Sequence, residues 1–155
     1  MTKIYAGFPG VGKSYLFKQC QGQNIKISDS DSSLFSWVED ENGEKVRNHE
    51  FPTNYVAHIQ KLKEEGYDII LVSTHKEVLQ ALVDAGIMFI IVTPHRSLKD
   101  AYLERYRQRN SPEAFVTLIE NKWDEFMDDI DSMKDTRPIH YLLEPELHLS
   151  HIVNL

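Results

Sequence analysis

A glycine-rich segment near the start of the chain carries the residues with the clearest chemistry. Gly7, Gly12, Lys13 and Ser14 fit the pattern G-x-x-x-x-G-K-[ST]. Glycines let the backbone turn tightly so that N–H groups converge on phosphate oxygens, and a following helix directs its positive N-terminal end at the same anion. The lysine reaches the β- and γ-phosphates, and the serine hydroxyl is a ligand for Mg²⁺. The segment therefore predicts a phosphate-binding loop (P-loop) for ATP with Mg²⁺. The residues expected to contact the nucleotide are Gly7, Gly10, Val11, Gly12, Lys13, Ser14 and Tyr15.

Two aspartates follow the second apolar run of the chain. Asp29 and Asp31 stand in the segment Ser28-Asp29-Ser30-Asp31-Ser32-Ser33. Ligands of open α/β sheets bind beyond the carboxyl ends of the strands, so both carboxylates are expected near the phosphates. Asp29 would support Mg²⁺ or accept a proton from an attacking hydroxyl, and Asp31 would orient the acceptor. The alternative is a turn or a helix N-cap, because Asp and Ser favour both.

Two arginines lie four residues apart in the charged stretch after the fourth apolar run. Arg105 and Arg109 share one face of the expected helix, whereas Arg107 points elsewhere. Two guanidinium groups on one face can clamp the transferred phosphoryl group and the nucleotide phosphates. The alternative is a solvated helix face, in which Asp100 and Glu104 pair with these charges.

Composition restricts the class of protein. The 155 residues include 41% hydrophobic residues, one cysteine (Cys20) and a net charge of -7. One domain of this size can bury a proper core without disulfides. The acidic balance does not predict binding to duplex nucleic acid, which favours a basic face. We expect no membrane span and no signal peptide, and hence a cytoplasmic protein.

Apolar runs alternate with amphipathic segments along the chain, which predicts an α/β fold with a parallel sheet. The expected strands are 3–6, 25–28, 67–73, 88–93 and 138–143. The expected helices are 14–21, 52–65, 76–85, 98–108 and 112–133. The polar stretch 39–47 contains a turn signal and is expected as a loop or flap within one domain covering 1–155.

Two further residues are candidates for contact with the acceptor. Arg47 is an arginine in the segment between the second and third strands, where it could meet an acceptor phosphate. His75 follows a buried strand at its carboxyl end, so it is expected to face the site. The alternatives are a surface arginine and a helix-capping histidine.

The P-loop, the Asp-x-Asp and the R-x-x-x-R, in this order, resemble the P-loop nucleoside and nucleotide kinase superfamily, which includes adenylate, deoxynucleotide, shikimate and gluconate kinases. The stretch 49–123 also resembles small kinase-like proteins of bacteriophages. The resemblance implies a three-layer α/β/α sandwich with a five-stranded parallel sheet in the order 2-3-1-4-5. It implies an acceptor-binding segment at about 32–66 and a short lid at about 105–115. It assigns Mg²⁺ support to Asp29, the acceptor to Asp31, and the lid clamp to Arg105 and Arg109.

Departures from these families leave the acceptor open. The third strand ends in Ser73-Thr74-His75, without the Asp-Gly-Phe-Pro of adenylate kinases or the glycines of shikimate kinases. The expected activity is ATP-dependent phosphoryl transfer to a small acceptor, first of all a nucleoside monophosphate. The alternatives are transfer to a nucleoside, a polynucleotide 5′ end or a sugar-like metabolite, or a nucleotide-binding regulator or ATPase. The sequence contains no Asn-Lys-x-Asp for guanine recognition, and its third strand lacks a terminal acidic residue, both of which favour the kinase.

Overall fold

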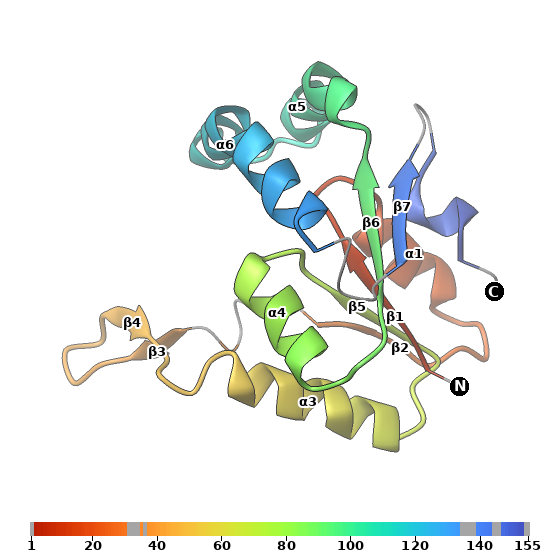
Figure 1. The fold of residues 1–155 in the computed structure, drawn as a ribbon, viewed down its shortest axis with the longest axis vertical. Helices are drawn as coiled ribbons and strands as arrows, with labels where there is room; N and C mark the ends of the chain where they lie inside the picture. Colours follow the sequence, from red (N-terminus) through yellow and green to blue (C-terminus); the bar gives the residue numbers. More distant parts are fainter. Residues whose placement is uncertain (1, 31–34, 36, 134–138, 144–146, 154–155) are drawn as a thin grey trace.

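A parallel sheet of five short strands forms the centre of the molecule (Figure 1). The computed structural model describes residues 2–30, 35, 37–133, 139–143 and 147–153. The sheet strands are β1 (Lys3–Gly7), β2 (Ile27–Asp29), β5 (Ile69–Val72), β6 (Ile90–Pro94) and β7 (Ile139–Leu143). All neighbouring pairs are parallel, and β1, β5 and β6 are buried over most of their lengths. Burial of this kind is expected where helices cover both faces of a sheet.

Helices cover the sheet on both sides. They are α1 (Lys13–Cys20), α3 (Thr53–Glu64), α4 (Lys76–Asp84), α5 (Lys99–Gln108) and α6 (Glu113–Asp131), with short 3₁₀ turns η1 (Arg96–Leu98) and η2 (Leu149–His151). In Figure 1, α1 lies with η2 on one side, whereas α3, α4 and α6 lie on the other. This arrangement confirms the expected α/β class with a five-stranded parallel sheet between helices.

The numbering in the expected strand order 2-3-1-4-5 requires a correction. The order in the structure is β2-β5-β1-β6-β7, because two further strands follow β2 along the chain and shift the numbers of the later ones, while the five expected strands keep their predicted neighbours. Two strands that the sequence analysis did not expect, β3 (Trp37–Glu39) and β4 (Lys45–Arg47), intervene along the chain between β2 and β5. They pair with each other in a separate two-stranded sheet and do not join the central one.

The β3–β4 hairpin replaces the expected loop or flap at 39–47. Its turn is closed by local hydrogen bonds, because the Asp40 carboxylate accepts from the backbone N–H groups of Asn42 and Glu44, each at 2.9 Å. Gly43 adopts a positive φ of 77°, a conformation that glycine allows without strain. In Figure 1 the hairpin projects away from the central sheet, beyond α3 and α4.

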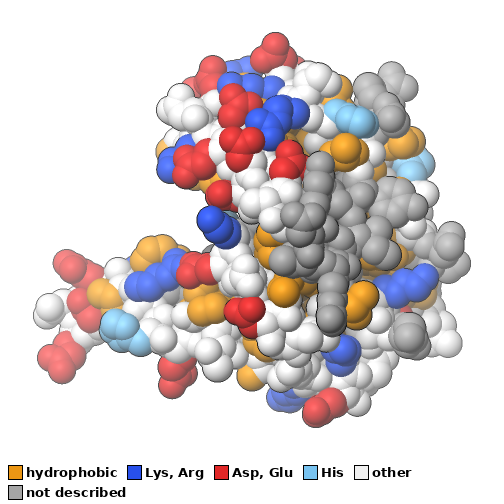
Figure 2. Space-filling view, viewed as in Figure 1, with side chains coloured by type: hydrophobic (Ala, Val, Ile, Leu, Met, Phe, Trp, Pro, Cys, Tyr) orange, Lys and Arg blue, Asp and Glu red, His pale blue; other side chains and the backbone are white. Residues whose placement is uncertain are grey.

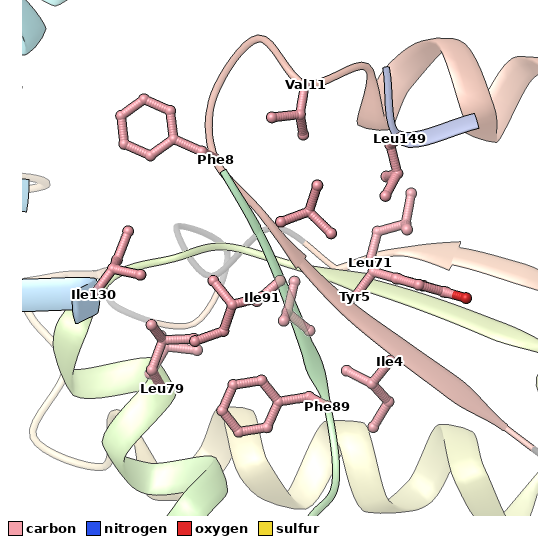
Figure 3. Packing of buried hydrophobic residues seen from close by; sticks show 14 of the residues in the cluster. Ile4, Tyr5, Phe8, Val11, Leu71, Leu79, Phe89, Ile91, Ile130 and Leu149 are labelled. Carbon is pink, nitrogen blue, oxygen red and sulfur yellow. The ribbon is translucent and has the colours of Figure 1, made fainter. Parts of the chain in front are cut away.

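The hydrophobic core fixes the P-loop to the sheet. Figure 3 shows side chains of β1, β5, β6 and α4 meeting in this core, with Phe8 and Val11 of the loop and Leu149 of η2 at its upper end. Phe8 packs edge-to-face on Trp123 of α6, with ring centroids 5.4 Å apart. The Trp123 indole N–H donates to the carbonyl of Arg96 at 3.0 Å, so the buried ring has its polar atom satisfied.

Within the described parts of the chain, no helix combines the length and the apolar character needed to cross a bilayer.

Candidate active site

A cavity of about 550 Å³ opens at the carboxyl ends of the central strands. The P-loop follows β1, Asp29 ends β2, and Ser73 follows β5. The carboxyl ends of these three neighbouring strands therefore meet at the cavity. The lining residues are Pro9, Gly10, Gly12, Lys13, Ser14, Tyr15, Asp29, Ser30, Val72, Ser73, His75, Arg105, Arg109, Phe115 and His148. The sequence therefore identified most of the chemistry-bearing side chains that the structure brings together here.

The P-loop is compact and depends on glycine. A Cβ atom added at Gly7 would lie 2.9 Å from Cγ2 of Val11 and 3.0 Å from Cδ of Lys13, so no larger residue fits there. Gly10 has a φ of 92°, in the left-handed region. The Lys13 ammonium donates to the Gly7 carbonyl at 2.7 Å, which holds the lysine side chain back across the loop.

Asp29 is held at its position by its neighbours. The Ser30 N–H donates to Leu71 of β5 at 2.9 Å, and the Tyr55 hydroxyl donates to the Ser30 carbonyl at 2.5 Å. Ser30 Oγ also lies 3.2 Å from Nε2 of His58. These contacts fix the backbone beyond β2, so the exposed Asp29 carboxylate is presented to the cavity by a rigid frame. Asp31 lies outside the described residues.

Helix α5 is docked directly on the P-loop. Nη1 of Arg105 donates to the Gly10 carbonyl at 2.6 Å, and the Tyr106 hydroxyl donates to the Pro9 carbonyl at 2.6 Å. The guanidinium of Arg105 also lies over the Tyr102 ring, 4.2 Å from its centroid. Burial raises the pKa of both Tyr102 and Tyr106, so the two phenols stay protonated and Tyr106 remains a donor.

The second arginine of the expected clamp lies in the same cavity. Arg109 stacks over the Tyr106 ring at 5.1 Å, and its Nε donates to the Ser111 hydroxyl at 3.1 Å. Arg107 does not line the cavity and pairs with Glu104 at 3.9 Å on the exposed side of α5. The spacing of the arginines thus separates two cavity-lining guanidinium groups from one that faces solvent.

Arg47 and His75 have different outcomes. His75 lines the cavity as the N-cap residue of α4. Arg47 does not line it: its guanidinium pairs with Glu77 of α4 and lies 5.6 Å from the Trp37 centroid and 4.9 Å from the Phe51 centroid. Contact between Arg47 and the acceptor therefore stays a prediction, and its side chain lies against Trp37 of the hairpin, Phe51 and α4 rather than in the phosphate cavity.

His148 is a cavity residue that sequence reasoning did not assign. Its Cβ atom would lie 3.5 Å from a Cβ built on Gly12, and the next residue, Leu149, donates its N–H to the Val11 carbonyl at 2.8 Å. The segment that follows β7 thus closes one side of the P-loop. No local sequence pattern predicts the contact of His148 and Leu149 with the P-loop, because it depends on packing between distant parts of the chain.

The charges of the cavity oppose those of the whole molecule. Its described lining carries three cationic side chains, Lys13, Arg105 and Arg109, and one carboxylate, Asp29. The chain as a whole has a net charge of -7. Local positive charge in a cavity attracts an anion and screens it from the surrounding acidic surface. A triphosphate is the kind of anion that this lining suits.

Mg²⁺ fits the cavity through two residues. The described residues contain no group of three or more His, Cys, Asp or Glu side chains that could hold a metal ion. Mg²⁺ in phosphate sites keeps several waters and needs only one or two protein groups beside the phosphates. The Ser14 hydroxyl and the Asp29 carboxylate both line the cavity and have the oxygen chemistry that Mg²⁺ prefers.

Models of known protein families and the curated proteins were compared with the chain, and none matches it.

Proposed function

We propose that this protein is a P-loop kinase that transfers the γ-phosphoryl group of Mg-ATP to a small acceptor, with a nucleoside monophosphate as the first candidate. ATP binds in the cavity above the P-loop. Lys13, Arg105 and Arg109 contact its phosphates, and Asp29 faces the reacting end. Tyr15, at the start of α1, is 62% exposed and lines the same cavity, so it is available to the nucleotide.

One observation carries the proposal. Arg105 of α5 and Arg109 at its C-cap share a cavity with the lysine of the P-loop and with the carboxylate that ends β2. Phosphoryl transfer proceeds mainly by positioning and by electrostatic stabilisation of the moving group, so fixed cations around the phosphates are the main requirement. A glycine-rich turn with a merely structural role does not require three cations from two separate elements.

The proposed reaction assigns a role to each group. The acceptor oxygen forms a bond to the γ-phosphorus while the bond from that phosphorus to the β,γ-bridging oxygen breaks, and ADP leaves with the electron pair. If the acceptor is a hydroxyl, its proton passes to Asp29 and then to water. Lys13, Arg105 and Arg109 stabilise the charge that spreads over the γ-phosphoryl oxygens. Mg²⁺ held by Ser14 and Asp29 would neutralise charge on the β- and γ-phosphates.

The other acceptors remain within the same chemistry. A nucleoside, a polynucleotide 5′ end or a sugar-like metabolite would present a hydroxyl to the same γ-phosphate. The nucleoside monophosphate is preferred on the resemblance, and Arg47, paired with Glu77, adds no support to it. A regulator with slow ATP hydrolysis is the alternative from a different class.

The deciding experiment measures ADP formation from ATP and Mg²⁺ by the purified protein. The panel of acceptors contains nucleoside monophosphates, nucleosides, oligonucleotides and sugars, and each product is identified by mass spectrometry. A kinase releases ADP at an appreciable rate only with a particular acceptor and forms an equal amount of phosphorylated product. Release of ADP and phosphate at the same rate with every compound, or with none added, would identify an ATPase instead.

A further inference from the structure

A second cavity lies beside the first, between α6 and the connection from β5 to α4. Its volume is about 250 Å³, and its walls are mostly aromatic and aliphatic. Phe8 of the P-loop and Phe115, Leu118 and Phe126 of α6 form these walls, and Thr74 lies at its edge. We call this cavity the aromatic pocket. In Figure 2 the molecular surface is hollowed between the part formed by α5 and α6 and the projecting hairpin.

The aromatic pocket adjoins the phosphate cavity. Pro9, His75 and Phe115 line both, so the two share a wall. Pro9 belongs to the P-loop, three residues before the end of the glycine turn that leads to Lys13, and Lys13 marks the β/γ end of the triphosphate. A molecule seated in the aromatic pocket therefore lies next to the end of ATP at which transfer takes place.

The aromatic pocket has little net charge. Its charged lining residues are Lys76 and Asp129, which pair across the pocket's rim with an N–O distance of 3.7 Å. A phosphate placed here would meet the carboxylate together with the ammonium. The Thr74 hydroxyl and the His75 ring add polar atoms to the lining, and His75 also lines the phosphate cavity. Aromatic walls with a few polar groups at one edge are typical of sites for uncharged heteroaromatic rings.

The aromatic pocket is large enough for only part of a ligand. Sites for whole drug-sized ligands occupy about 300 to 1,000 Å³. An apolar cavity of about 150 Å³ is enough for benzene. At about 250 Å³ the pocket admits one small ring system and excludes a larger chain.

We infer that the aromatic pocket seats the uncharged planar ring of the phosphate acceptor, a nucleobase or a ring of similar size. This inference rests on the proposed kinase function. The acceptor's reacting oxygen, on its phosphate or its sugar, would extend past Pro9 and His75, which line both cavities, to reach the γ-phosphate of ATP. The acceptor is thereby assigned to α6 and the β5–α4 connection rather than to the hairpin, where Arg47 is engaged with Glu77. A polyol without a ring has no apolar group to bind between the phenylalanines of the aromatic pocket, so it is not the expected acceptor.

The test compares acceptors that differ only in the ring. Each nucleoside monophosphate is paired with ribose 5-phosphate, and each nucleoside with ribose, as acceptors for transfer from ATP. Leu118 is 46% exposed, so Leu118→Asp can place a charge in the aromatic pocket without disturbing the core. Met88, 64% exposed just before β6, at the opposite end of that strand from the cavity, gives the matched control Met88→Asp.

We expect transfer to the ring-containing members only, and a fall of about tenfold or more in acceptor kcat/KM in Leu118→Asp. ATP affinity and Tm should match those of Met88→Asp, which keeps wild-type kcat/KM. Preference for the ring-free compounds, or equal kinetics in the two variants, overturns the inference while leaving the kinase intact. Calorimetric binding of nucleosides and nucleotides to both variants separates the two ideas further. Wild type without acceptor-dependent transfer refutes the kinase, and ring binding unaffected by Leu118→Asp refutes the aromatic seat.

Discussion

Lys13 reaches back across the P-loop to a backbone carbonyl. Its ammonium bonds to the Gly7 carbonyl at 2.7 Å, while its side chain is only half-buried. This contact joins residues six apart in the chain, so we expect the fold to tolerate its loss. In the proposed reaction the same ammonium turns to the β- and γ-phosphates, where its charge is needed.

Lys13→Ala should therefore abolish transfer and leave the fold intact. The loss is expected to be at least about 10²-fold in kcat, as for removal of one group that stabilises developing charge. Circular dichroism and urea unfolding should match wild type to within about 0.5 kcal/mol, as for substitutions away from the core. Wild-type turnover in a correctly folded variant would remove the P-loop from the mechanism.

The arginines of α5 differ by what they face. Arg105 and Arg109 line the phosphate cavity, and Arg107 pairs with Glu104 at the surface. Arg109→Ala should lower kcat by about 10² to 10³ with a smaller change in ATP affinity, because its contribution is expected mainly in the transition state. Arg105→Ala should lower kcat by a similar factor and also weaken ATP binding, because Arg105 bonds to the Gly10 carbonyl of the loop. Arg107→Ala should have little effect. Steady-state kinetics and ATP titration measure both quantities.

Lysine is the informative replacement at the same positions. Arg105→Lys and Arg109→Lys should recover little activity, because an ammonium cannot make a two-pronged contact or stack on a tyrosine ring as a guanidinium does. Equal and small effects on kcat at Arg105, Arg107 and Arg109 would refute the clamp hypothesis. They would support the alternative, in which all three arginines belong to a solvated helix face. A large effect at 107 alone would contradict the observed geometry.

At the scale of elements, local signals predicted the helices and sheet strands well. The apolar runs became β1, β2, β5, β6 and β7, and each amphipathic stretch became a helix within a few residues of its expected bounds. These elements are encoded by periodicity, by glycines at their ends and by β-branched residues, all of which are local. The position of the glycine-rich loop was equally clear, because the pattern fixes residue types at fixed spacing, and its binding of phosphate stays a prediction.

The features that the sequence did not predict have separate physical reasons. The hairpin strands contain only three residues each, too few to show an alternating pattern against the charged background. The position of the Arg47 side chain could not be predicted from sequence, because its partner Glu77 belongs to α4, which follows α3 and β5 along the chain. His148 was missed for the same reason, since its place beside Gly12 results from the packing of η2 on α1.

Helix α3 supports the end of β2 through His58, which gives stability a pH dependence. Burial, and secondarily the nearby Lys61 charge, lower the pKa of His58 from 6.5. A histidine with a lowered folded-state pKa binds a proton more readily in the unfolded chain. Its effect on stability is therefore absent above pH 6.5 and becomes destabilising as the pH falls through 6.5 toward the folded-state pKa.

His58→Gln should flatten the acid side of the stability profile. Urea unfolding of wild type and variant at several pH values between about 7.5 and 5 measures the difference. The variant is expected to lose less stability than wild type on acidification, whatever its stability at neutral pH. Parallel profiles would show that His58 titrates alike in the folded and unfolded chains. His49→Gln, on an exposed residue of the described surface, is the control for histidine loss as such.

At the scale of the whole molecule, the P-loop is clamped between distant segments. From one side, α5 contributes the Arg105 and Tyr106 bonds to the loop carbonyls. From the other, η2 contributes the Leu149 N–H bond to Val11, and both of these side chains are fully buried (Figure 3). The loop glycines allow many backbone conformations, so the packing on both sides restricts the loop to the one observed. If the loop binds ATP as proposed, we expect stability and nucleotide affinity to be coupled through η2.

Leu149→Ala tests this coupling, and Leu82→Ala is the matched control variant. Both leucines are fully buried, but Leu82 lies on α4 and does not line the phosphate cavity. Each truncation should lower the free energy of unfolding by about 2 to 5 kcal/mol, measured in urea. Only Leu149→Ala is expected to weaken ATP binding as well, by about tenfold if 1.4 kcal/mol of the loss falls on the loop conformation. Calorimetric titration with Mg-ATP, at a temperature where both variants are folded, separates the two effects. Equal ATP affinities in the two variants would show that η2 stabilises the fold without shaping the P-loop, and equal weakening would point to a general loosening of the core.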